Sequence, residues 1–594
     1  MVNSRDKLVA RRVGALAAPS LVSTAVAIVT AVLIGPRLAL AQDTVGATNV
    51  QSGEAFEHAV AEGKSPEQGA ADDSRNVRTG KLETIDPAAI GTLDSSGGGF
   101  PPEMWKGSSR ALVESLLRQL PVVTDSFAMQ DLARRLLLTR AAVPLGPATP
   151  PGVLALRVER LLTAGQSADV VNLIGRTSGP SEVAVISRAR ADALFLTGDR
   201  EAACSFGEGM ITDSEDVYWL KVATLCRSIR NDKAGAGLAL ELLHEQDSTD
   251  PQFFKLATEL LAPESDKKAK VEKLNPLRLE MLRAAGRSIP TELLDQADPS
   301  ILASVSRDQS LALDQRLALA QRAEARGALS GAELARIFAS VAFPPDEVPN
   351  AVEAAKSDPG PRANARLYQL AVGKHPDEKR FAALQTLWRQ GVRAGNLGTV
   401  ARATRSAAKS IEPDSELSWL APDMVRALLA AGDPKAAGRW LAVLSEDARA
   451  RLWPFLAFTG QGAGGEGFDQ AVEAWYRTLS DLTREQKRER SLLVFTLIEA
   501  MGQKISESRW RDLVGGTEGA PWQGDIAALR LLETASDQGR LGEAVMYALF
   551  ALAPHGPKQA HPDVIARATK ALDRAGLPDD ARRIAVEALL ERGL

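Results

Sequence analysis

The only two cysteines of the chain, Cys204 and Cys226, are the residues whose type and spacing most directly predict a covalent bond. The apolar pattern around them predicts one helix near 200–211 and a second near 215–229. If these helices pack antiparallel, the two cysteines differ in height by about three residues, roughly 4.5 Å of helix rise. We therefore favour a disulfide, which would stabilise the fold by about 3 kcal/mol for a loop of this size. The alternative is two buried, unpaired cysteines that act as small hydrophobic residues.

Other patterns that could support catalysis or metal binding are weak. No two of the five histidines are three or four positions apart, and the glycine-rich stretch 460–467 lacks the Lys-Ser/Thr ending of a phosphate-binding loop. Glu264-Ser265 and Glu507-Ser508 begin like the catalytic glutamate motif of lytic transglycosylases, but neither match continues. We therefore expect no catalytic residue, no cofactor and no metal. An envelope enzyme or enzyme subunit that acts on peptidoglycan or polysaccharide remains the alternative.

A ladder of glycines and large apolar residues dominates the C-terminal third of the chain. The glycines are Gly432, Gly467, Gly502, Gly539 and Gly576, and the residues eight positions after them are Trp440, Trp475, Trp510, Tyr547 and Ile584. A period of 35 to 37 residues is typical of stacked helical hairpins. A glycine in a left-handed conformation can end the first helix of each hairpin, and the large residue can then fill the groove between hairpins. We interpret the ladder as the core of a repeat array; the alternative is a row of aromatic residues that stack on a peptide.

The turns of this array resemble those of the tetratricopeptide repeat family. The best matches are LLAAGDPKAA at 428–437 and LFLTGDREAA at 194–203, with Gly-Asp followed by alanine. The period exceeds the 34 residues of that family, and Glu507 replaces the alanine five positions after Gly502. The resemblance implies an all-α solenoid of antiparallel helical hairpins that binds proteins or peptides in a concave groove. It identifies no individual contact residue.

The N-terminus has the parts of a secretory signal peptide in the expected order. Basic residues from Arg5 to Arg12 precede an apolar stretch at 13–34, and a small-residue site ends at Ala41. We predict cleavage after Ala41 and a periplasmic location. The alternative is an uncleaved membrane anchor, since the apolar stretch is long enough to span a bilayer. Only in that case would the protein contact a membrane.

The remaining chain divides into four regions by composition and periodicity. We predict a flexible, low-complexity linker at 42–107, N-terminal helical repeats at 108–250, an irregular helical region at 251–390 and tetratricopeptide-like repeats at 391–594. Within the linker, the less polar segment 100–105 either docks on the first helix as a cap or recognises another protein. The irregular region is where we expect functional specialisation.

The charge pattern restricts the partners. The formal net charge is −4, and both signs are mixed along the chain, which argues against a nucleic-acid partner. We expect protein or peptide partners and a function as an interaction scaffold or adaptor in the cell envelope. A structural part of a motility or secretion machine is a further alternative.

Overall fold

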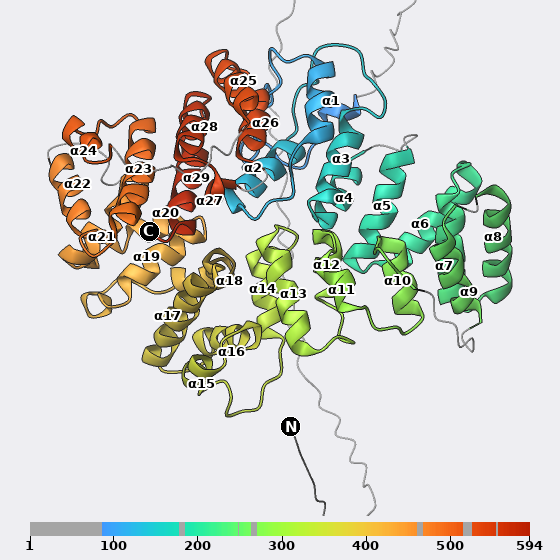
Figure 1. Ribbon diagram of the computed structural model, residues 1–594. Coiled ribbons are helices and arrows are strands. Elements are labelled where there is room, and N and C mark those ends of the chain that lie inside the picture. The colour runs from blue at the N-terminus through green and yellow to red at the C-terminus, as the bar shows by residue number, and fades with distance from the viewer. Residues whose placement is uncertain are drawn as a thin grey trace, which may run out of the picture. The chain divides into compact units, whose positions relative to one another are not determined.

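The computed structural model describes residues 86–177, 184–247, 249–262, 270–459, 467–514, 525–553 and 556–594. All of them belong to one compact unit, Leu82–Leu594. These residues form 29 α-helices and three short 3₁₀-helices, and no β-strand occurs among them (Figure 1). The prediction of an all-α protein is therefore confirmed for this part of the chain. The predicted signal peptide, its cleavage site at Ala41 and the linker up to residue 85 lie outside the described residues.

The helices follow one another with short connections. The first group comprises η1 Pro87–Ala89, α1 Arg110–Gln119, α2 Phe127–Leu138, α3 Val153–Thr163, α4 Ser167–Ile174, α5 Ala184–Thr197, α6 Arg200–Asp213, α7 Tyr218–Ile229 and α8 Lys233–Gln246. The second comprises α9 Pro251–Leu261, α10 Pro276–Ala284, α11 Thr291–Asp295, α12 Pro299–Val305, α13 Leu313–Ala325, α14 Gly331–Ala339, α15 Ala351–Ser357, α16 Pro361–Val372 and α17 Asp377–Ala394. The third comprises α18 Leu397–Lys409, η2 Ser415–Leu417, α19 Ala421–Ala430, α20 Pro434–Gly438, η3 Leu441–Val443, α21 Glu446–Phe458, α22 Phe468–Arg477 and α23 Arg484–Ala500. The last comprises α24 Glu507–Arg511, α25 Ile526–Asp537, α26 Leu541–Leu552, α27 Gly556–Gln559, α28 Pro562–Arg574 and α29 Pro578–Glu591.

Many consecutive helices pack against each other as pairs, among them α7 with α8, α16 with α17, α25 with α26 and α28 with α29. The turns between such helices use glycine for a physical reason. Gly432 has φ +72°, and the next amide, Asp433 N–H, donates to the Leu428 carbonyl at 2.8 Å. Gly576 has φ +86°, with the same bond from Leu577 to Leu572 at 2.9 Å. A left-handed glycine thus satisfies carbonyl groups that the helix end leaves free.

The ladder residues are mostly internal. Four of them are buried, namely Trp440, Trp475, Tyr547 and Ile584. Trp510 is only half-buried, because it lies on the five-residue helix α24, and its indole N–H donates to Glu499 Oε1 at 3.0 Å. Gly467 also differs from the other ladder glycines. It is the N-cap residue of α22, and the described part of the chain resumes at this glycine.

The segment 86–107 corrects the linker prediction. Phe100, Met104 and Trp105 are all buried, and the amide of Gly542 on α26 donates to the Met104 carbonyl at 2.9 Å. A Cβ on Gly542 would lie 2.4 Å from the Trp105 ring, so glycine is needed for this contact. The segment therefore docks on the folded unit. It contacts the C-terminal helix α26 and not the first helices alone. The linker prediction is wrong for this segment despite its low apolar content, because a few large side chains are enough for docking when another part of the chain supplies the apolar surface.

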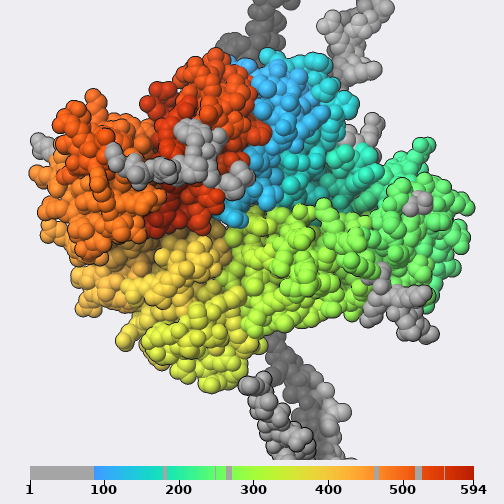
Figure 2. Space-filling model, in the orientation of Figure 1, coloured from blue at the N-terminus to red at the C-terminus, as the bar shows by residue number. Residues whose placement is uncertain are grey.

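Two hydrophobic cores organise the unit. The first core runs from Ala88 to Leu589 and combines residues from both ends of the described chain. The second core extends from Ala191 to Ala403 and belongs mainly to α5 through α14. The first core forms because α2 packs against both α26 and α29 (Figure 1). Figure 2 shows the same arrangement on the surface, where blue N-terminal residues border both red C-terminal and green central ones.

Candidate functional site

A large cavity among the described residues lies between helices of the N-terminal and central parts of the unit. We call it the inter-helix cavity; it has a volume of about 1030 Å³ and is lined by α2, the α3–α4 turn, α12, the α13–α14 turn and α18, among others. Ligand pockets usually measure about 300–1,000 Å³, so this cavity could hold a small molecule or a segment of polypeptide. Much of its lining comes from the region 251–390, where we expected specialisation.

Small residues shape the walls of the cavity. They include Gly165, Ala168, Ala303, Ala328, Gly331 and Ala332. Gly331, the first residue of α14, has a specific role, because a Cβ at this position would lie 2.6 Å from the carbonyl carbon of Arg402 on α18. Glycine therefore lets the start of α14 approach the backbone of α18. This close approach brings the side chains of both helices to one wall.

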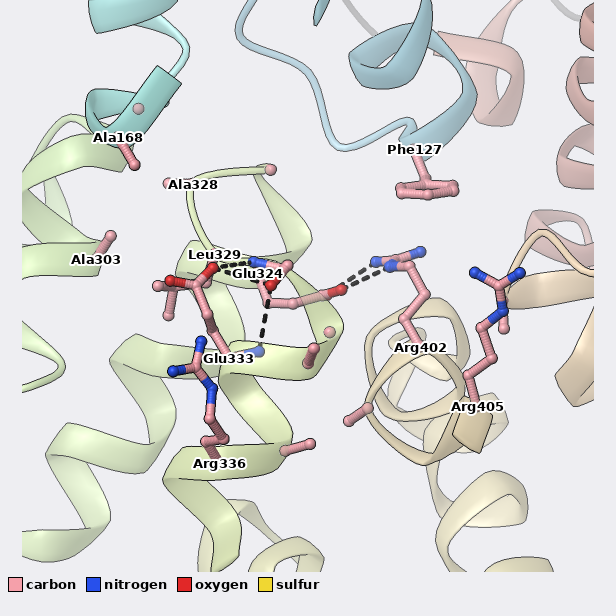
Figure 3. A pocket seen from close by; sticks show the side chains of 18 of the residues that line it. Phe127, Ala168, Ala303, Glu324, Ala328, Leu329, Glu333, Arg336, Arg402 and Arg405 are labelled. Carbon is pink, nitrogen blue, oxygen red and sulfur yellow. Dashed lines mark hydrogen bonds and ion pairs between the residues drawn. The ribbon is translucent and has the colours of Figure 1, made fainter. Parts of the chain in front are cut away.

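A buried ion pair forms the centre of this wall (Figure 3). Arg402 donates from Nε to Glu324 Oε1 at 2.6 Å and from Nη2 to Oε2 at 2.8 Å, and the Glu324 side chain is 1% exposed. The guanidinium carbon also lies 4.5 Å from the centre of the Phe127 ring on α2. Burial alone would lower the pKa of Arg402, but the charge and hydrogen bonds of Glu324 outweigh it and the pKa is raised. The Arg402 guanidinium thus stays charged, and its contacts with Glu324 and Phe127 join α2, α13 and α18.

The other carboxylates of the cavity also have arginine partners. Asp169 accepts from Arg134 Nε at 2.6 Å and from Nη2 at 2.8 Å. Glu333 accepts from Arg307 at 3.0 Å and closes a capping box with Ser330 at the start of α14. Their acceptor oxygens are therefore already used by the protein.

The fourth carboxylate of the cavity, Asp131, extends the network to the C-terminus. It accepts from Arg583 on α29 at 2.8 Å and, more weakly, from Arg135 at 3.4 Å. Arg135 in turn bonds Asp580 at 2.7 Å. The cavity wall that α2 provides is thus held by ion pairs to the last helix.

Two further arginines that line the cavity, Arg336 and Arg405, are more exposed to solvent than Arg402. Arg336 is exposed on α14 and has no ion pair with any residue that the structure describes. Arg405, on α18, shares Asp433 with Lys409, at 2.9 and 3.0 Å. Figure 3 shows these two arginines on opposite sides of the Glu324–Arg402 pair.

The residues singled out from the sequence lie elsewhere. Cys204 and Cys226 form a disulfide between α6 and α7, with their Cα atoms 5.6 Å apart, and both side chains are buried. None of the ladder residues, from Trp440 to Ile584, lines the inter-helix cavity. The cavity arginines could not be predicted from the sequence, because they come from separate helices with no common spacing.

The described residues contain neither a metal-binding cluster nor a membrane-spanning helix. No group of three or more His, Cys, Asp or Glu side chains is arranged to hold a metal ion in this part of the chain. No helix within the same residues has the length and apolar character needed to cross a bilayer.

Comparison with known proteins assigns no family to this chain, so its class is described from its architecture. No protein-family model matches the chain, and no functionally characterised protein is significantly similar to it in sequence. The fold and the cavity therefore define an all-helical protein with a ligand-sized, arginine-lined cavity.

Proposed function

We propose that this protein is a tetratricopeptide-like helical scaffold that binds a segment of a partner protein in the bacterial cell envelope. The inter-helix cavity is the observation that carries the proposal. It is too large for a single ion, and helices from the N-terminal and central parts of the unit contribute to it. The paired packing of consecutive helices and the left-handed glycine turns support the repeat class.

The proposed location rests on two features. The N-terminal sequence has the basic, apolar and small-residue parts of an export signal that ends at Ala41. The Cys204–Cys226 disulfide supports an oxidising compartment, since such bonds are rare in the cytosol. Both features are consistent with a periplasmic adaptor.

Site-specific photo-crosslinking in cells tests the proposal. A photoreactive amino acid is placed at Ala332, an exposed residue of the cavity wall, and the cross-linked proteins are identified by mass spectrometry. The matched control carries the same amino acid at Ala234, which is exposed on α8 outside the cavity. We expect one discrete partner at Ala332 that is absent at Ala234. Equal labelling at both positions, or no protein adduct at either, contradicts the proposed function.

A further inference from the structure

The inter-helix cavity has more positive than negative side chains. Six arginines line it, at positions 134, 307, 336, 380, 402 and 405, against the four carboxylates of Asp131, Asp169, Glu324 and Glu333. The formal charge of the lining is therefore 6 − 4 = +2, whereas the whole chain carries −4. A cavity opposite in sign to the rest of the molecule attracts negatively charged ligands.

Two arginines of the cavity keep hydrogen-bond donors that their carboxylate partners do not use. Both oxygens of Asp169 and both oxygens of Glu324 accept hydrogen bonds from arginine. Arg134 and Arg402 each use Nε and Nη2 in these pairs, and neither Nη1 bonds a residue that the structure describes. The unbonded groups therefore include N–H donors of both arginines, which the acceptors of an occupant can satisfy, besides one buried acceptor, Gln166 Oε1.

Arg336 and Arg405 extend this donor surface. Arg336 lies one turn after Glu333 on α14, and Arg405 lies one turn after Arg402 on α18. Arg405 reaches Asp433 with Nε and Nη2, which leaves its Nη1 unbonded among the described residues. Planar arginine groups bind carboxylates through paired, charge-assisted hydrogen bonds. Two such groups on opposite sides of a buried ion pair suit a ligand with several carboxylates.

The size and the walls of the cavity favour a polypeptide over a single small anion. One carboxylate or phosphate would fill a small part of about 1030 Å³. Wall residues such as Ala168, Ala303 and Ala332 have short side chains, which allow a peptide backbone to come close. From charge, donors and shape together, we infer that the inter-helix cavity binds an acidic peptide segment, whose Asp or Glu carboxylates are held by Arg336 and Arg405; the inference rests on the proposed function as a protein-binding scaffold.

Binding of short labelled peptides to the purified protein tests this inference by fluorescence anisotropy. The probe is a peptide of alternating Asp and Gly, and its control replaces each Asp by Asn. We expect the acidic peptide alone to bind, with an affinity that falls as salt is added. Arg336→Gln/Arg405→Gln should weaken binding by roughly tenfold or more, because the variant loses charge-assisted hydrogen bonds to the carboxylates of the peptide. The variant should keep the wild-type melting temperature, since Lys409 remains paired with Asp433 and Arg336 has no ion pair among the described residues.

Arg393→Gln provides the matched control. Arg393 is exposed on α17, outside the cavity, so its loss should leave binding unchanged. Equal binding of the Asn peptide, or unchanged binding by the double variant, overturns the inference. An acidic polysaccharide such as polygalacturonate that binds while the peptide does not also overturns it.

The two proposals fail in different ways. A discrete cross-link at Ala332 without binding of the acidic peptide contradicts the inference of an acidic ligand but agrees with the proposed protein-binding function. Absence of any cross-link at Ala332 removes the proposed function itself.

Discussion

The first hydrophobic core joins residues from Ala88 to Leu589, whereas the second is assembled within Ala191 to Ala403. The two cores also differ in what closes them. In the first, polar contacts connect the ends of the described chain, such as Ala128 N–H to Glu587 Oε2 at 2.8 Å. In the second, a disulfide joins positions only 22 residues apart. The first core thus depends on contacts between distant parts of the chain, and the second contains a covalent bond between nearby positions.

This difference has an energetic consequence. Bringing distant segments together costs chain entropy before any contact forms, and the cost grows with the length of the loop. The first core must recover that cost through its buried area and its ion pairs. The second core starts from short loops, so its helices can pack before the rest of the unit is complete. We therefore expect the two cores to respond separately to substitutions.

The largest expected effect tests how much the ladder contributes to the first core. Trp475 is 1% exposed, and its ring lies 5.9 Å from both Trp453 and Phe495. Trp475→Ala should lower the free energy of unfolding by about 3–5 kcal/mol, because it leaves a large cavity. Urea denaturation measures the change. Trp510→Ala is the matched variant and should cost clearly less, since Trp510 is half-buried; an unchanged stability of Trp475→Ala would restore the interpretation of the ladder as a binding surface.

Loss of the disulfide tests the second core. Cys204→Ala/Cys226→Ala should reduce stability by about 3 kcal/mol, because the unfolded chain loses a cross-link over a loop of this length. Hydrogen exchange should accelerate in α6 and α7 and remain unchanged in α28 and α29. Equal acceleration in both places would show that the two cores unfold as one. A count of two free thiols on unreduced, denatured protein would show that the bond is absent in solution.

The features that the sequence could predict are local ones. The left-handed turn at Gly432 and the Cys204–Cys226 pair depend on residues near one another in the chain, so spacing alone identified them. The inter-helix cavity depends on α2 reaching the C-terminal helices, and no periodicity encodes that contact. Arg402 lies beside Glu324 because α18 packs on α13 and α14, and Trp105 is buried because its segment packs on α26. These features became visible only in three dimensions.

The contact between the ends of the first core should depend on pH. Burial raises the pKa of the Glu587 carboxyl to about 7, an effect that Glu591 reinforces, while the bonds from Ser126 and Ala128 and the charge of Arg402 oppose it. Between the ordinary pKa near 4.5 and about 7, the folded state keeps a proton that the unfolded state has released. Stability should therefore fall as the pH rises through this range, by roughly 1.4 kcal/mol per unit at most.

Glu587→Gln isolates this contribution. Glutamine keeps a carbonyl oxygen for the Ala128 amide but does not titrate, so the variant should lose about 2 kcal/mol less than the wild type between pH 5 and pH 7. Urea denaturation at the two pH values measures the difference. Asp573→Asn removes an exposed carboxylate from α28 and should behave like the wild type. A Glu587→Gln variant with the wild-type pH dependence would contradict the assignment.

The smallest expected effect addresses the ion pairs between the two ends. Asp580 is 5% exposed and accepts from both Arg135 and Arg583 at 2.7 Å, but both arginines reach solvent. Asp580→Asn should therefore cost only about 1–2 kcal/mol, less than the loss of a fully buried pair. Glu507→Gln, which removes the exposed pair with Arg511, should cost less than about 0.5 kcal/mol. Hydrogen exchange in the Asp580→Asn variant tests whether α2 and α29 open cooperatively. If exchange accelerates equally in α2 and α29 but not in α7, the two ends of the first core open in a single event. Acceleration in α29 alone would mean that the last helix can detach while α2 keeps its place in the core.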